Sequence, residues 1–257
     1  LASGLRALYD FDKASLQDAL RPRQVGTMKR ESGAGEHPVY VSRNKGKALL
    51  LDGDSWLDLD TTGVFSKSEP FSIGLWVNIP ADLREGVIFH KGISERLYNC
   101  RGYHLYLKDN KLELSMAHTA PSDAITKLTK DDVPRDQWIQ LTVTYNGSSI
   151  ADGFRLFLNG QEMAMETVID QLTKDILFGK DQLTNNKQPG LQIGGWSRGL
   201  GFKSGKVDDI TVYDRELTPY EIQILAGKAR WASIANENKS DLTPASRSAL
   251  KNYFLSA

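Results

Sequence analysis

The sequence predicts an antiparallel β-sandwich, and three observations lead to that fold class. Several segments alternate apolar with polar or small residues, which is the pattern of strands that bury one face. Gly, Asn, Asp and Pro separate these segments at short intervals and indicate turns. The clearest segment places a polar turn, residues 63–70, directly before the alternating run of residues 71–78. Sandwiches of this kind bind ligands more often than they catalyse reactions.

The expected elements follow in chain order. A first strand is expected over residues 5–11, and residues 12–45, rich in Gly, Arg, Lys and Ser, are expected to form a long surface excursion. From Lys47 the strands come in quick succession. Their expected ranges are 48–53, 71–78, 102–108, 111–116, 138–145, 154–158, 191–196 and 207–213. One sandwich domain over residues 1–227 accounts for all of them.

A short helix is expected after the last strand. Thr218 fits the N-cap, Pro219 the first helical position and Glu221 the third, while Gly227 offers a C-terminal stop. A second Thr-Pro start predicts another helix over residues 244–255, whose apolar stripe is Leu250, Tyr253 and Phe254. Residues 228–257 are therefore expected to form a helical extension towards a domain that lies elsewhere in a longer protein.

Composition excludes several classes of function. The 257 residues carry 32 basic and 32 acidic side chains, so no net field attracts nucleic acid or an anionic membrane. No stretch reaches the roughly 20 apolar residues that a membrane span needs. Cys100 is the only cysteine, which excludes an internal disulfide and a cysteine-based metal site. We expect neither a nucleic-acid partner nor membrane insertion.

The strand blocks also carry a resemblance. Their order and spacing from residue 5 to residue 227 resemble the laminin-G-like, concanavalin A-like jelly roll. The blocks are 48–53, 71–77, 137–145, 157–160, 191–195 and 207–217. Such a fold supports many ligands, so the resemblance is strong for architecture and weak for ligand.

A narrower resemblance lies in residues 86–92, 101–107 and 225–255. These segments resemble the jelly-roll module of large exported bacterial proteins, known mainly from planctomycetes and related groups. Those proteins flank the module with domains of unknown function and often carry a cytochrome c-like domain. This chain has no Cys-x-x-Cys-His, so it holds no haem. The resemblance implies a periplasmic, cell-surface or extracellular location and the flanking domains as partners.

Ligand-binding candidates come from the outward parity of the strands. Where alternate residues such as Phe71 and Ile73 face the core, the intervening side chains face outward. If these outer faces belong to one sheet, they form a sugar-binding groove of aromatic rings and hydrogen-bonding groups. The alternative is that each aromatic side chain is covered by a loop or a terminal helix. The outward candidates are Trp76, His104, Tyr106, Trp138 and Arg155.

Loops supply a second set of candidates. Tyr98, Arg101 and His118 are expected to rim one end of the groove, and Trp196 to form another wall. Equally, Arg101 is a candidate for pairing with a local carboxylate, which would give it no role in binding.

The resemblance further implies one structural calcium ion. Many relatives hold calcium on the convex side with an Asp near the last strand, a position that Asp208 matches. Asp10 or Asp12 and the Asp52-Gly53 turn are its expected companions, because calcium takes 6 to 8 oxygen ligands. The alternative reading makes these residues turn formers and solvated strand positions.

Catalytic motifs of this fold are missing from the sequence. It has no Glu-x-Asp-x-Glu strand of the sandwich glycosidases, no lyase Arg-x-Glu or Gln-Ile-His motif, no Gly-x-Ser-x-Gly elbow and no His-Glu-x-x-His. We therefore predict a non-catalytic module that binds carbohydrate, a polysaccharide or glycan. A structural module docking on flanking domains is the first alternative, and an atypical glycan-active enzyme is the second.

Overall fold

The computed structural model describes residues 3–30, 37–93, 100–195 and 199–228, and these form a two-layer sandwich. Two antiparallel sheets make the layers. Sheet 1 contains β1 (Leu5–Tyr9), β3 (Val39–Arg43), β4 (Gly46–Leu50), β6 (Phe71–Asn78), β11 (Trp138–Tyr145), β12 (Phe154–Leu158), β13 (Gln161–Glu162) and β16 (Lys206–Tyr213). Sheet 2 contains β2 (Thr27–Arg30), β5 (Ser55–Asp58), β7 (Glu85–Lys91), β8 (Gly102–Lys108), β9 (Lys111–Thr119), β10 (Asp123–Thr129), β14 (Met165–Asp170) and β15 (Leu191–Ile193).

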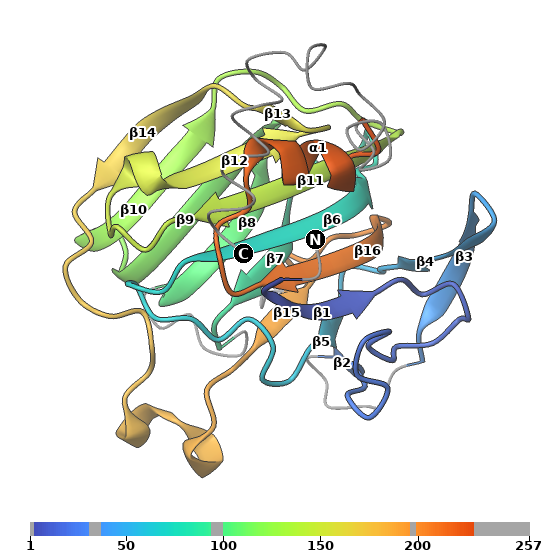
Figure 1. Cartoon of the computed structure of the whole chain (residues 1–257), viewed down its shortest axis with the longest axis horizontal. Helices are drawn as coiled ribbons and strands as arrows, with labels where there is room; N and C mark the ends of the chain where they lie inside the picture. The colour runs from blue at the N-terminus through green and yellow to red at the C-terminus, as the bar shows by residue number, and fades with distance from the viewer. Residues whose placement is uncertain (1–2, 31–36, 94–99, 196–198, 229–257) are drawn as a thin grey trace, which may run out of the picture.

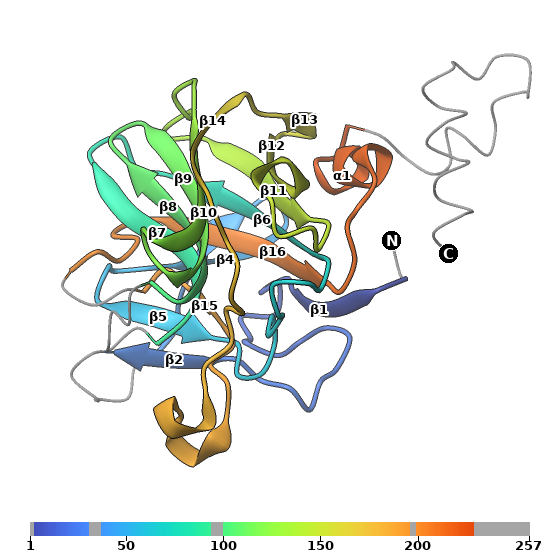
Figure 2. The same ribbon diagram turned by 90° about the vertical axis from the view of Figure 1, so that its left-hand side faces the viewer.

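The strand order brings distant segments of the chain together. Sheet 1 runs β13-β12-β11-β6-β16-β4-β3, with β1 also pairing with β16. Sheet 2 runs β14-β10-β9-β8-β7-β15-β5-β2. Figure 2 shows β7, β8 and β9 in one layer and β6, β11 and β16 in the other. The all-β sandwich predicted from the sequence is confirmed.

The core lies between the sheets and follows the predicted alternation. Phe71, Ile73, Leu75 and Val77 of β6 are fully buried. They stand beside the buried inward residues of β11, since Val77 pairs with Ile139 and the register continues along both strands. Removing these apolar surfaces from water supplies the main stabilisation of the sandwich. Strand parity was therefore a correct guide to the core.

The expected excursion over residues 12–45 is wrong in one respect. It contains two strands, β2 at the edge of sheet 2 and β3 at the edge of sheet 1, and an isolated bridge between Gln17 and Val25. Both edge strands are largely exposed or half-buried. The mostly polar β2 lacks the apolar alternation that marks a strand in the sequence, which is why it was missed, whereas β3 begins with the β-prone run Val39-Tyr40-Val41, a signal that the prediction overlooked.

The predicted helix forms on the outer face of sheet 1. It is α1 (Pro219–Leu225), and Thr218 and Glu221 form the reciprocal capping box that the sequence indicated. Its Ile222 packs with Phe157, Tyr213 and Leu217 in a small apolar cluster outside the main core. Figure 2 shows α1 on the side of the sandwich away from β7, β8 and β9. The helix therefore covers part of sheet 1.

Two sequence predictions about the end of the chain concern residues beyond this helix. The expected helix over residues 244–255 and most of the extension 228–257 lie outside the described residues. Within the described part of the chain, no helix has the length and apolarity needed to cross a membrane.

Candidate functional site

The outward-facing candidates lie on two opposite surfaces instead of one. Trp76, Trp138 and Arg155 belong to β6, β11 and β12 of sheet 1. His104 and Tyr106 belong to β8 of sheet 2. The groove that would unite them required one common sheet, so a single site containing all five residues is excluded.

On sheet 1 the two tryptophans hold a cation from the chain itself. The guanidinium of Arg43 lies 4.7 Å from the ring centroid of Trp76 and 4.8 Å from that of Trp138. Its Nη1 donates to Asp208 at 2.5 Å and to Asp209 at 2.9 Å. Cation–π contact and ion pairing thus occupy the groups that the sequence suggested for a sugar. Arg43 was not among the candidates.

Arg155 and the neighbouring Phe157 are also engaged within the protein. Arg155 forms ion pairs with Glu216 and Glu162. Phe157 is buried in the apolar cluster beneath α1. For these side chains the structure matches the alternative in which local partners and the helix cover the outer face.

Arg101 and His118, predicted to rim one end of a groove, lie in contact with each other, His118 near the end of β9. The Arg101 guanidinium lies 3.0 Å from His118 Nε2, donates to the His118 carbonyl at 3.1 Å and donates to Gln182 at 2.7 Å. It also lies over the Phe178 ring, with 5.6 Å to the centroid. Arg101 therefore connects β9 with the segment that contains Phe178 and Gln182 at one end of the sandwich. Tyr98 and Trp196 lie outside the described residues.

The five expected calcium ligands do not assemble a metal site in the described part of the chain. Asp208 is buried and bound by Arg43. Burial, followed by repulsion from Asp209, raises the pKa of Asp208 to about 6, so the carboxylate is ionised and paired at neutral pH. Asp52 caps the turn to Ser55 and pairs with Arg30.

Asp10 accepts a hydrogen bond from the backbone of Asp12, and Gly53 forms a turn with positive φ against Lys203. The guanidinium of Arg43 holds the position beside Asp208 that a cation would take, so the donor set does not fit calcium. Calcium binding itself stays a prediction.

The outer face of sheet 2 carries a row of polar residues across four strands. Strand pairing places Asp58 beside Gln192, Gln192 beside His90, and His90 beside His104. Burial, with a smaller effect from His104, lowers the pKa of His90 to about 3, so this imidazole stays neutral at physiological pH. His104 bonds Glu113 at 3.1 Å, and that bond is the main reason that the pKa of Glu113 is lowered.

Tyr106, the other candidate on this face, donates to Glu85 at 2.7 Å. Burial is the main cause of its raised pKa, and the bond to Glu85 adds to it, so the phenol stays protonated. His104 and Tyr106 thus extend the polar row towards β9, each with a carboxylate partner.

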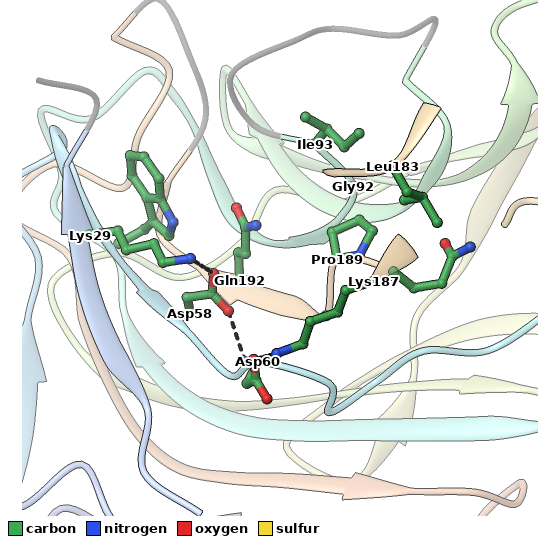
Figure 3. A pocket seen from close by; sticks show the side chains of 12 residues that line it. Lys29, Asp58, Asp60, Gly92, Ile93, Leu183, Lys187, Pro189 and Gln192 are labelled. Atoms are coloured by element: carbon green, nitrogen blue, oxygen red, sulfur yellow. Dashed lines mark hydrogen bonds and ion pairs between the residues drawn. The ribbon is translucent and has the colours of Figure 1, made fainter. Parts of the chain in front are cut away.

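A hollow of about 260 Å³ opens over β5 and β15 of this face and is called here the sheet 2 hollow (Figure 3). Lys29 Nζ donates to Asp58 at 2.5 Å, the Asp60 backbone N–H donates to Asp58 at 2.8 Å, and Lys187 pairs with Asp60. Ile93 and Pro189 form an apolar side, and the Gln192 amide lies between that side and Lys29. The lining residues are Lys29, Trp56, Asp58, Asp60, Gly92, Ile93, Leu183, Lys187, Gln188, Pro189, Gly190 and Gln192.

One buried polar atom of this lining, the indole Nε1 of Trp56, lacks a partner within the described residues. The Gln192 side chain, an amide with an acceptor oxygen, interacts with His90 on the neighbouring strand. A buried polar atom without a hydrogen bond costs about 1–3 kcal/mol, so native proteins rarely leave one without a ligand, water or protein group. A donor and an acceptor facing one hollow can together bind hydroxyl groups.

Sequence reasoning missed this hollow although part of its signal was available. Leu57 and Leu59 are core residues, which places Trp56 and Asp58 on the outer face of β5 at positions i and i+2. Gln192 likewise lies between the buried Leu191 and Ile193. Nothing in the sequence showed that β5 and β15 are neighbours, because that pairing is a property of the topology.

The fold and this hollow define a lectin-type sandwich, with a polar and aromatic recess on the outer face of one sheet. A laminin-G model described as the concanavalin A-like lectin/glucanases superfamily matches residues 51–223, and the chain belongs to this superfamily. Among curated proteins, none matches the chain.

Solved structures with the same fold include domain 4 of AbnA, a GH43 extracellular arabinanase from Geobacillus stearothermophilus, in complex with arabinotriose. The TM-score is 0.65 at 24% identity, covering 87% of this chain and 98% of that one. The binding domain of Paraclostridial Mosquitocidal Protein 1 gives 0.61 at 17% identity, covering 91% and 53%. The ligand binding domain of botulinum neurotoxin serotype D with N-acetylneuraminic acid gives 0.58 at 14%, covering 87% and 50%. The chain therefore spans about half the length of the toxin chains, and these likenesses concern the fold.

Proposed function

We propose that this chain is a non-catalytic carbohydrate-binding module and that its ligand occupies the sheet 2 hollow. The observation that carries the proposal is the buried, unpartnered donor Trp56 Nε1 beside the Gln192 amide in the lining of that hollow. Few polar groups placed among apolar and aromatic ones are typical of small-molecule sites. The hollow is smaller than the roughly 300 Å³ of a drug-sized pocket, which suits one sugar unit of a longer glycan.

Two structures with the same fold were solved with sugars, arabinotriose in one and N-acetylneuraminic acid in the other. Their ligands support a glycan as the partner of this chain. We also infer, from the resemblance to modules of exported proteins, that the chain works outside the cytoplasm as part of a larger bacterial protein.

The carboxylates of the hollow support a role without catalysis. Asp58 accepts hydrogen bonds from Lys29 and from the Asp60 backbone, and Asp60 pairs with Lys187. A glycosidase needs one carboxyl group that is protonated and another that attacks the sugar or activates water. A carboxylate paired with a lysine ammonium group does not supply the protonated acid, so this pair lacks one of the two roles and we expect no turnover of bound glycans.

The test is binding of the purified chain to a panel of polysaccharides and oligosaccharides, with Trp56→Ala and Trp76→Ala compared. Both substitutions remove one indole, but Trp56 lines the hollow and Trp76 lies on the opposite sheet. We expect Trp56→Ala to lower affinity at least about tenfold and Trp76→Ala to leave it unchanged in molecules that remain folded. If Trp76→Ala lowered the affinity and Trp56→Ala did not, the site would lie on sheet 1. If the wild type bound no glycan of the panel, carbohydrate binding would be rejected.

A second candidate function is docking on flanking domains, which one observation favours. An apolar hollow of about 340 Å³ lies between β1, Trp76 and α1 and is lined in part by Leu5, Leu8, Ile224 and Leu225. It lies where α1 leads into the C-terminal extension. A glycan panel without any binding, together with binding of this chain to the adjoining domains of its parent protein, would favour docking over sugar recognition.

A further inference from the structure

We propose that the ligand of the sheet 2 hollow is an uncharged glycan, recognised through hydroxyl groups; this inference rests on the proposed function and specifies its ligand class. The two sugars found in structures with this fold differ in charge, since arabinotriose is neutral and N-acetylneuraminic acid is a carboxylic acid. The charged and polar side chains that line the hollow favour a neutral sugar over an acidic one.

The charges of the lining cancel in pairs. Its cations are Lys29 and Lys187, and its anions are Asp58 and Asp60. Lys29 pairs with Asp58 at 2.5 Å, and Lys187 pairs with Asp60. A carboxylated or sulfated sugar would have to compete with a protein carboxylate for either ammonium group, and it would be repelled by the displaced aspartate.

Cations next to the hollow are also engaged. Arg30, adjacent to Lys29 on β2, pairs with Asp52 at 2.5 Å. Arg101 is bound by His118 and Gln182. His90, whose pKa is lowered to about 3, adds no positive charge. Lys91, next to the lining residue Gly92, is buried against the Phe178 ring outside the lining, and burial lowers its pKa to about 7. Arg30, Arg101 and His90 therefore offer no unpaired charge to an acidic sugar, and Lys91 is not part of the lining.

Two polar atoms of the lining select for hydroxyl groups. The unpartnered Trp56 indole can only donate, and Gln192 Oε1, beside His90, can only accept. A hydroxyl group both accepts and donates, so two hydroxyls of one sugar ring can satisfy both atoms. An ionised carboxylate can only accept, and it would leave Gln192 Oε1 facing a negative charge. The apolar side formed by Ile93 and Pro189 suits the carbon-bound hydrogens of a sugar ring.

The inference is tested by calorimetric titration with neutral glycans (arabinan, xylan, galactan, β-glucan) and acidic ones (polygalacturonate, alginate, sialyllactose, chondroitin sulfate). We expect Trp56-dependent binding within the neutral set only. Its affinity should change less than about twofold between 20 and 500 mM NaCl, because no net charge is paired on binding.

Charge variants make the test sharper. Asp58→Asn frees Lys29 and gives the hollow one net positive charge, so we expect the ratio of acidic to neutral affinity to rise at least about tenfold. Asp54→Asn makes the same chemical change on an exposed side chain outside the lining and should leave the ratio unchanged. Should Asp58→Asn not fold, Asp60→Asn frees Lys187 instead, and the positive φ of residue 60 suits asparagine.

The outcomes separate the inference from the proposed function. Salt-sensitive, Trp56-dependent binding of acidic glycans to the wild type would overturn the inference and leave the carbohydrate-binding function standing. An unchanged affinity ratio in both aspartate variants would also overturn it, because the ion pairs would then not set the preference. If no glycan of either class binds, the proposed function itself fails.

Discussion

Arg43 is the residue on which the outer face of sheet 1 depends. Its guanidinium lies between the rings of Trp76 and Trp138 and donates to Asp208, and both charged side chains of the pair are at least 90% buried. Two buried charges stabilise a fold little more than a well-packed apolar pair would, but each becomes costly when its partner is removed. Arg43 was not predicted, because it ends a short edge strand and its partner Asp208 lies 165 positions further along the chain.

We predict that Arg43→Met lowers the free energy of unfolding by about 3–5 kcal/mol, because Asp208 would remain buried without its counter-charge. Urea denaturation measures the change. Arg6→Met is the matched control: Arg6 pairs with Asp214, its side chain is 54% exposed, and the expected loss is below about 1 kcal/mol. Equal losses in the two variants would show that the Arg43 pair is as solvated as the Arg6 pair.

At the scale of elements, α1 is an example of a helix that local sequence signals are enough to predict. Thr218 accepts from the Glu221 backbone, and the Glu221 side chain accepts from the Thr218 backbone at 2.9 Å. Both groups are within four residues of each other, so the signal is local and was predicted correctly. By contrast β2 has no local strand pattern and forms a strand where β5 offers it an edge, while β3 pairs with β4 and carried a local signal, Val39-Tyr40-Val41, that was not used.

We predict that Thr218→Ala destabilises the protein by about 1 kcal/mol, the usual effect of losing a helix N-cap. The apolar cluster beneath α1 keeps the helix attached, so the transition should stay cooperative. Ser122→Ala, which removes an exposed hydroxyl from a loop, is the control and should change stability by less than about 0.5 kcal/mol. A loss as small as that of the control would mean that the cap contributes nothing to this helix.

On the scale of the whole molecule, the two outer faces differ in what covers them and in the side chains they carry. Sheet 1 is covered in part by α1 and carries the Arg43 ion pair, whereas sheet 2 carries the polar row and the sheet 2 hollow. We expect such a sandwich to attach to neighbours through the face that carries α1 and to meet a ligand through the face that carries the sheet 2 hollow. The sequence placed the candidates of both faces in one groove, because parity tells inside from outside but does not tell one sheet from the other.

The calcium site that the resemblance implies leads to a prediction about the stability of the whole molecule. Because Arg43 already neutralises Asp208, we expect the thermal unfolding midpoint to be the same within about 1 °C in millimolar calcium and in chelator. Differential scanning calorimetry makes the comparison. A calcium-dependent rise that Asp208→Asn abolishes would instead support the ion that the family resemblance implies.

The sequence by itself determined the fold class, the inward residues of the main strands, the capped helix α1 and the superfamily. Each of these depends on local periodicity, capping or block order, which are properties of neighbouring positions along the chain. The tertiary structure decided which strands share a sheet, and hence that Trp76 and Trp138 enclose Arg43 while Trp56, Asp58 and Gln192 meet in one hollow. Pairings such as β5 with β15 join residues more than 130 positions apart, and only the folded chain brings them into contact.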